Sequence, residues 1–225
     1  MKVVLKLSGH LLFPYITHEK ITEYAEAMKK ILSLGHEAHA VVGGGIPARQ
    51  YIEAARKLGV DEASCDKIGI LISQINAMLL IKALGDKAYH RVPQNFEELE
   101  EALASKKSVI LGGLQPGQST SAVAALLAER LKADLIIFTT DVDGVYTEDP
   151  KISPGARKID EISVRELKRL VLLHEAKAGG YKLMDLVALS IIERAKIPAV
   201  VINGTQTENI FKVITGEKIG TKITP

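Results

Sequence analysis

The sequence predicts an α/β fold built around a mainly parallel sheet. Two observations favour this class. Short apolar strand candidates alternate with helical patterns along the chain, and glycine-rich loops connect three of these strands to the helices that follow them. With 225 residues, the chain can bury a substantial core as one domain or as two coupled lobes. It has no internal repeat and no long linker.

The first half of the chain alternates regularly between the two kinds of element. Strand candidates are short runs of β-branched residues and leucine, and helix candidates carry apolar residues three and four positions apart. We expect strands at 2–7, 37–42, 87–92 and 108–111, and helices at 17–34, 50–58, 63–84 and 96–104. The wide apolar band of the helix at 63–84 could serve as a subunit interface, but core packing is the default interpretation.

The second half continues the alternation with more turns. We expect helices at 121–132, 163–171, 184–195 and 208–215, strands at 134–139 and 198–202, a loop at 151–162, and a last segment at 219–223 pairing at the sheet edge. Ser163 and Glu166 form a capping box for their helix. Asp143-Gly144 predicts a hairpin, which Asp149-Pro150 ends as a turn.

Charge and cysteine content narrow the function classes. Lys+Arg 29 against Asp+Glu 27 give a net charge of +2, and both signs are spread along the chain, so binding to nucleic acid or to a membrane surface is not expected. Cys65 alone cannot form an internal disulfide. The N-terminus enters a strand instead of a signal peptide, and no apolar run approaches the ~18 residues of a membrane helix. We therefore expect a cytoplasmic protein.

The most informative stretch is the glycine-rich loop at 112–120, between a buried strand and a helix of small residues. Ser119 or Thr120 can cap that helix, whose first free N–H groups face the loop. No titratable side chain lies between Gly112 and Ala128. The loop is therefore suited to hold a phosphate by backbone and hydroxyl donors, not to perform chemistry.

Cations and glycines at other loops point the same way. Lys6 ends the first strand, where ligands of open parallel sheets bind. Three glycines at 43–45 precede a helix with Arg49 in its first turn, and Lys182 follows a glycine pair. Each has an ordinary alternative: a solvated lysine at Lys6 or Lys182, and a tight turn at 43–45.

Two further positions carry a functional interpretation beside a structural one. Asp66 begins the helix at 63–84, where it can bind a ligand or simply favour the helix dipole. Asn76 interrupts the apolar face of that helix. The segment 140–150 places polar oxygens around one ring, Tyr146, which suits a base and ribose or a solvated hairpin.

Taken together and in this order, the motifs resemble a known family. They are Lys6-Leu7-Ser8-Gly9, Val42-Gly43-Gly44-Gly45 with Arg49, the loop at 112–120, and Thr140-Asp141-Val142-Asp143-Gly144-Val145-Tyr146 with Asp149-Pro150. The sequence resembles the amino acid kinase superfamily, most of all its uridylate kinases of the archaeal type, from the first strand to the last helix. The loop at 112–120 is the most specific motif and the triple glycine the least.

The resemblance implies an architecture and a reaction. It implies a three-layer αβα sandwich as a single domain over 1–225, with an acceptor-binding lobe at about 1–132 and an ATP-binding lobe at about 133–225. The implied reaction is transfer of the γ-phosphoryl group of ATP to UMP, giving UDP and ADP in pyrimidine biosynthesis. Mg²⁺ would come with the ATP phosphates and need no metal site of the protein. A homo-oligomer, a hexamer built as a trimer of dimers, is also implied.

The resemblance also implies roles for individual residues. Lys6 and Lys182 would be catalytic. The ATP-binding set would be Lys6, Leu7, Ser8, Gly9, His10, Gly45, Arg49, Thr140, Asp141, Tyr146 and Asp149. UMP would be bound by Gly44, by Asp66 at its ribose, and, at its phosphate, by Leu114, Gln115, Pro116, Gly117, Gln118, Ser119 and Thr120.

The chain departs from the family pattern at three places. Ser121 stands where many relatives carry an Asp thought to orient the active-site lysines, His10 replaces a more usual Glu or Lys, and Thr140-Asp141 replaces Thr-Asn or Thr-Lys. Two alternatives follow: a superfamily kinase for isopentenyl phosphate, carbamate or an acyl amino acid, or a non-catalytic nucleotide- or oxoanion-binding member. Arg49, where isopentenyl phosphate kinases have His, and Asp66, which suits a ribose, favour UMP.

Overall fold

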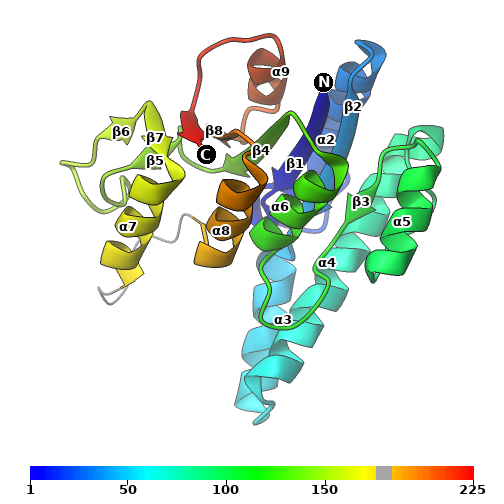
Figure 1. The fold of residues 1–225 in the computed structure, drawn as a ribbon. Helices are drawn as coiled ribbons and strands as arrows, with labels where there is room; N and C mark the ends of the chain where they lie inside the picture. Colours follow the sequence, from blue (N-terminus) through cyan, green and yellow to red (C-terminus); the bar gives the residue numbers. More distant parts are fainter. Residues whose placement is uncertain (176–183) are drawn as a thin grey trace.

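The α/β fold with a mainly parallel sheet is confirmed by a computed structural model, which describes residues 1–175 and 184–225 (Figure 1). In this part of the chain, a seven-stranded sheet has the order β3-β2-β1-β4-β8-β9-β7. Neighbouring strands of this sheet are parallel, except for the antiparallel pair β8 and β9. The strands are β1 (Lys2–Leu7), β2 (Glu37–Val42), β3 (Ile110–Leu111), β4 (Leu135–Thr140), β7 (Glu161–Ser163), β8 (Ala199–Asn203) and β9 (Thr221–Thr224).

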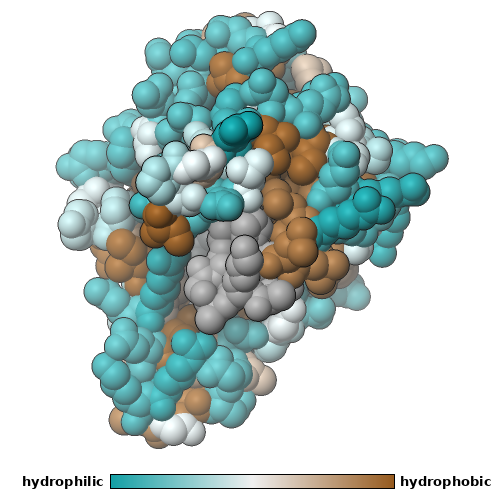
Figure 2. All heavy atoms as spheres, turned by 90° about the vertical axis from the view of Figure 1, so that its left-hand side faces the viewer, coloured by the Kyte–Doolittle hydropathy of each residue, from teal (hydrophilic) through white to brown (hydrophobic). Residues whose placement is uncertain are grey.

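Helices cover both faces of the sheet, which gives the three layers (Figure 1). One face packs against α5 (Phe96–Ala104), α6 (Thr120–Leu131), α7 (Val164–Glu175) and α8 (Leu186–Ala195). The other packs against α1 (Gly9–Leu12), α2 (Glu19–Ser33), α4 (Glu62–Leu84) and α9 (Glu208–Ile214). Helix α3 (Gly45–Lys57) runs along α4, and both extend beyond the sheet (Figure 1). Hydrophilic residues dominate the face in Figure 2, with apolar side chains in a central strip.

Strand alternation decides on which face of the sheet Lys6 lies. Val3 and Leu5 of β1 pack into the core beneath α2 and α4, whereas Val4 packs into the core beneath α6 and α8. Successive side chains of a strand point to opposite faces, so Lys6 lies on the same face as Val4. The lysine is therefore on the side of the sheet that α6 and α8 cover.

Three predictions of strands and turns are wrong. No strand forms at 87–92: a short 3₁₀ turn, η1 (Gly85–Lys87), is followed by a single bridge between Ala88 and Ser108. Segment 151–162 is not only loop, since it contains β6 (Lys158–Ile159) and the start of β7. The last segment is not the sheet edge, because β9 lies between β8 and β7.

Asp143-Gly144 does not form the predicted hairpin turn. The strand that follows it, β5 (Val145–Tyr146), pairs antiparallel with β6, which begins at Lys158, twelve positions beyond Tyr146. Gly144 has φ +151°, and a Cβ there would lie 2.4 Å from Thr221 Oγ1. Glycine is thus required at 144 because the backbone there approaches Thr221 of β9 too closely for a side chain. The residues next to Gly144 in the sequence do not predict this contact.

Helix α4 also differs from expectation. The stretch Glu62–Lys87 is long and apolar enough to cross a membrane by length and composition, although no such run was expected. Its buried face carries Ser73, Gln74 and Asn76, which hydrogen-bond the backbone of two glycine loops. These contacts are typical of a helix in the core of a globular fold, which passes the same test.

The buried His39 makes the stability of this sheet depend on pH. Its Nδ1 accepts a hydrogen bond from Val109 N–H at 3.1 Å, so Nε2 carries the proton and donates to Glu37 Oε1 at 3.1 Å. Burial lowers the pKa of His39 below its usual 6.5. Since the unfolded chain binds the proton more readily, stability should be complete above pH 6.5 and fall below it.

We expect the thermal midpoint to drop between about pH 6.5 and pH 5, and His39→Gln to flatten that drop because an amide does not titrate there. Differential scanning calorimetry of both proteins across this range is the measurement. Equal slopes in the two proteins would place the acid sensitivity elsewhere.

Candidate functional site

The site lies where the carboxyl ends of the central strands meet. From β1, the chain continues to β2 and β3 on one side of the sheet, whereas β4 and β8 lie on the other side. The strand order therefore reverses between β1 and β4, and ligands of open α/β sheets bind at such a point. Residues directly after β1, β2 and β3 form the glycine loops.

Two adjoining cavities open at this edge. The first, called here the Lys6 cavity, has a volume of about 290 Å³, and the second, the Asp66 cavity, about 270 Å³. They share four lining residues, Gly44, Gly45, Arg49 and Thr120. A group bound in one cavity therefore lies next to a group bound in the other.

Most of the predicted ATP set gathers at the Lys6 cavity. Its lining includes Lys6, Ser8, Gly9, His10, Gly45, Arg49 and Thr140. The side chain of Leu7 is instead fully buried in the core, so only its backbone is available to a ligand. Tyr146 and Asp149 line neither cavity, and Asp149 accepts a hydrogen bond from Lys151 N–H at 2.9 Å.

The predicted UMP set divides into lining and supporting residues. Gly44, Asp66, Gln115, Gln118 and Thr120 line the Asp66 cavity. Leu114, Pro116, Gly117 and Ser119 do not line it. Gly117 N–H donates to Asp66 Oδ2 at 2.8 Å, and Ser119 caps α6 by accepting from Ser121 N–H and Ala122 N–H.

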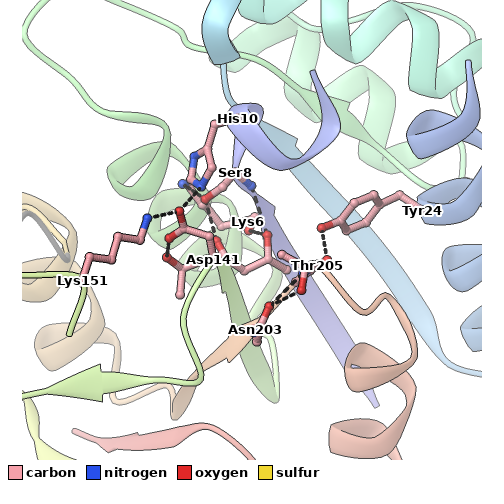
Figure 3. Close-up of polar contacts among 11 residues, drawn as sticks. Lys6, Ser8, His10, Tyr24, Asp141, Lys151, Asn203 and Thr205 are labelled. Carbon is pink, nitrogen blue, oxygen red and sulfur yellow. Dashed lines mark hydrogen bonds and ion pairs between the residues drawn. The ribbon is translucent and has the colours of Figure 1, made fainter. Parts of the chain in front are cut away.

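Lys6 is held in place by the neighbouring strand (Figure 3). Its Nζ donates to Ser8 Oγ at 2.8 Å, and Ser8 is fixed in turn by Thr139 of β4. Burial lowers the pKa of Lys6 to about 8, and the negative charge of Asp185 opposes that shift. The ammonium is therefore mostly charged at pH 7 and is paired to a neutral hydroxyl, which leaves its charge available to an anion.

Asp141, which lines neither cavity, lies beside His10 of the Lys6 cavity (Figure 3). Asp141 pairs with Lys151 and lies 3.6 Å from His10, measured from Oδ2 to Nε2. Burial lowers the pKa of His10, and Asp141 opposes the shift. His10 therefore enters the cavity as a largely neutral imidazole next to three cations, Lys6, Arg49 and Lys151.

Comparison with known proteins identifies the family. A model of the amino acid kinase family matches residues 1–203. The chain belongs to the amino acid kinase family. It is 44% identical over 223 residues to the uridylate kinase of Methanobrevibacter smithii, with 99% of each chain covered. It is 46% identical over 218 residues to that of Methanocaldococcus jannaschii, covering 95% of this chain and 96% of the relative.

A solved structure gives the same result. The crystal structure of the uridylate kinase from Archaeoglobus fulgidus matches the whole of both chains with a TM-score of 0.89 and 45% identity. UMP kinase from Bacillus anthracis matches with a TM-score of 0.83 at 25% identity, covering 99% of this chain and 95% of that one. The resemblance to amino acid kinases of the uridylate kinase type is therefore confirmed.

In this member of the amino acid kinase family, α4 supports both glycine loops. Asn76 Nδ2 donates to Gly43 O and Gly44 O, each at 3.0 Å. Ser73 Oγ accepts from Gly113 N–H at 2.7 Å, and Gln74 Nε2 donates to Gly113 O at 3.1 Å. The sequence showed Asn76 as a break in the apolar face, but Ser73 and Gln74 were missed although they break the same pattern.

Three further features of the predicted site concern Lys182, metal ligands and Ser121. Lys182 lies outside the described residues. Among residues 1–175 and 184–225, no group of three His, Cys, Asp or Glu side chains could hold a metal ion. Ser121 lines the Lys6 cavity, at the position where relatives were expected to carry a carboxylate.

Proposed function

We propose that this protein is a UMP kinase that transfers the γ-phosphoryl group of ATP to UMP, giving UDP and ADP. The observation that carries the proposal is the pair of adjoining cavities, one around Lys6 and one around Asp66, with four shared lining residues. The names of relatives at 44% and 46% identity support the same substrates. The reaction belongs to pyrimidine nucleotide biosynthesis, and we place it in the cytoplasm.

The chemistry fits a site without a general base. The second pKa of a phosphate monoester is about 6, so the attacking phosphate of UMP is mostly dianionic at neutral pH. The obstacle is the approach of two anions in line, which positive potential and positioning overcome. Lys6, Arg49 and the N–H groups at the start of α6 supply that potential at the junction of the cavities.

Each substrate is assigned to one cavity. The phosphates of ATP occupy the Lys6 cavity. The nucleoside end of ATP extends toward Thr140, Asp141, Tyr146 and Asp149. UMP occupies the Asp66 cavity, with its phosphate at 114–120 and its ribose at Asp66. The acceptor thus binds to residues 1–132, whereas the nucleoside end of ATP binds to 133–225 and the ATP phosphates bind to Lys6, to residues 8–10, and to Gly45 and Arg49. Lys182 is proposed as a second cation.

Mg²⁺ is proposed to enter with ATP. This ion usually keeps several waters and binds through substrate phosphates and one or two carboxylates. Asp141, beside His10, would be the carboxylate for that purpose, and it would exchange its ion pair with Lys151 for the metal. When bound, the ion would neutralise charge on the transferred phosphoryl group, while Lys6 and Arg49 orient it.

A coupled assay tests the proposal directly. ADP release is measured with ATP and Mg²⁺ and with UMP, CMP, isopentenyl phosphate or carbamate as acceptor. UMP is expected to give the highest kcat/KM. Absence of UMP-dependent turnover would exclude the proposal, and preferential use of isopentenyl phosphate or carbamate would assign the site to another kinase of the family.

Asp66→Ala is expected to weaken UMP binding far more than it lowers kcat. The carboxylate lines the Asp66 cavity and also holds Gly117 N–H, so its loss removes a ribose acceptor and loosens the phosphate loop. A loss of roughly 1–3 kcal/mol in UMP binding is expected. Calorimetric titration with UMP is the measurement, and equal affinity would reduce Asp66 to a contribution to the helix dipole near the start of α4, which Asp61 caps.

Self-association through α4 is proposed as well, in a hexamer built as a trimer of dimers. Leu71, Ile75, Met78 and Leu79 form an exposed stripe at helical spacing, with exposed fractions of 47%, 52%, 51% and 37%. A contiguous apolar stripe of this kind marks an interaction surface, and a second copy presents the same stripe.

We expect Ile75→Glu to lower the molecular mass in solution, measured by light scattering coupled to size-exclusion chromatography. Leu34→Glu is the control, because Leu34 is equally exposed, at 50%, but lies at the end of α2. An unchanged mass of the Ile75→Glu protein would remove α4 from the interface.

A further inference from the structure

The carboxylate of Asp185 links the N-termini of α6 and α8, the two helices that cover the face of the sheet on which Lys6 lies. Asp185 caps α8, where Oδ1 accepts a hydrogen bond from Ala188 N–H at 2.9 Å. Its other oxygen, Oδ2, accepts a hydrogen bond from Ser119 Oγ. Asp185 therefore joins two helices whose capping residues lie 66 positions apart in the sequence.

Ser119 connects this carboxylate to the phosphate loop. While its Oγ donates to Asp185, it accepts from Ser121 N–H at 3.1 Å and from Ala122 N–H at 3.0 Å. The residue after it, Thr120, lines both cavities. The position of Asp185 thus fixes the point where the loop ends and α6 begins.

The same carboxylate acts on Lys6. Lys6 lies on the sheet face covered by α6 and α8, and its ammonium donates a hydrogen bond to the neutral Ser8. The other charged groups at its cavity are His10 from α1 and Arg49 from α3, neither of which offsets a positive charge. Ser121, on α6, is neutral. Among the described residues, Asp185 is the carboxylate whose charge favours the protonated form of Lys6.

We propose that Asp185 is a positioning residue for phosphoryl transfer, which holds the phosphate loop in register with Lys6 through its hydrogen bond to Ser119 and its cap of α8. This inference rests on the proposed kinase function. It also assigns to α8 the orienting role that Ser121 cannot perform. Asp185 lines neither cavity and acts through Lys6 and Ser119.

Asp185→Asn removes the negative charge and keeps the cap of α8. The amide oxygen can still accept from Ala188 N–H, but the NH2 group that replaces Oδ2 cannot accept from Ser119 Oγ. The lost contact with Ser119 should lower activity equally at every pH, whereas the lost charge should add a deficit that depends on pH. The alkaline limb of kcat/KM for ATP, which reports groups of the free enzyme, should move to lower pH by roughly one unit. The deficit in kcat/KM should therefore grow between pH 6.5 and pH 9.

Asp61→Asn is the matched control. Asp61 caps α4 by accepting from Ser64 N–H at 3.0 Å, and it lines neither cavity. The same substitution there should leave the pH profile unchanged. A merely structural role of Asp185 would give a deficit independent of pH, and that result would overturn the proposal.

A second readout needs no turnover. Lys6 can be titrated by NMR of its ε-carbon, assigned by loss of the signal in Lys6→Met. A lower Lys6 pKa in Asp185→Asn than in the wild type supports the proposal, and equal values overturn it. If the wild type fails to use UMP, the proposed function fails in the assay, while this titration still decides the effect of Asp185 on Lys6.

Discussion

Lys6→Met is expected to lower kcat by about 10²–10³-fold, the usual effect of removing one donor that stabilises transition-state charge. The KM for UMP should change much less, because Lys6 lines the Lys6 cavity and not the Asp66 cavity. Steady-state kinetics with varied UMP at saturating ATP measures both quantities. Turnover close to that of the wild type would remove Lys6 from the mechanism.

The same substitution should stabilise the nucleotide-free protein. Folding lowers the pKa of Lys6 from 10.5 to about 8, so the charged form costs ~3 kcal/mol in the folded state at neutral pH. Methionine follows the lysine stem without the charge. The thermal midpoint should therefore rise by several degrees at pH 7, and this gain should shrink between pH 8 and pH 10.5, where the lysine is already neutral in the folded protein.

Lys57→Met provides the control for both measurements. Lys57 forms an exposed ion pair with Glu53 at 2.8 Å and lines neither cavity. Its replacement should leave kcat unchanged and shift stability by less than about 0.5 kcal/mol. A loss of stability in Lys6→Met would mean that its hydrogen bond to Ser8 outweighs the cost of burying its charge.

The strands and helix caps around this site could be predicted, because each depends on residues close together in the sequence. Strand β1 and strand β2 have the predicted bounds, since each is a short run rich in apolar residues that ends at a serine or glycine. Ser119 was a predicted cap of α6, and Ser163 with Glu166 forms the predicted capping box. In each case, the residues that decide the structure lie within four positions of one another.

The rest depends on contacts between distant segments. Strands β5 and β6 have two residues each, too few for a pattern, and they form because the chain returns to pair Val145 with Ile159. The predicted helix at 184–195 placed Asp185 inside the helix, whereas it caps α8 at Leu186, and its bond to Ser119 requires α6 and α8 to be neighbours. Asn76 was visible as an anomaly, whereas its partners at 43–44 were not.

Gly9→Ala is expected to abolish most activity and to destabilise the protein. A Cβ at Gly9 would lie 2.2 Å from Gly45 N and 2.5 Å from Gly43 O, both backbone atoms that cannot rotate away. The contact is reciprocal, since a Cβ at Gly45 would lie 2.6 Å from Gly9 O. The turns after β1 and β2 therefore pack backbone against backbone.

Separating these two turns to admit a methyl group would move Gly9 and Gly45 apart within the Lys6 cavity, and would displace Gly44 and Gly45 from the Asp66 cavity that they also line. We expect a loss of about 1–3 kcal/mol in the free energy of unfolding, measured by chemical denaturation, and a larger proportional loss in kcat, because transfer depends on sub-ångström alignment of two bound phosphates.

Gly155→Ala is the matched control, because a Cβ there meets no atom within 4 Å. It should leave both measurements unchanged. Wild-type kcat in Gly9→Ala would mean that the two turns can separate without consequence, and the alignment of the cavities would then have to come from the α4 contacts of Asn76 and Ser73 alone.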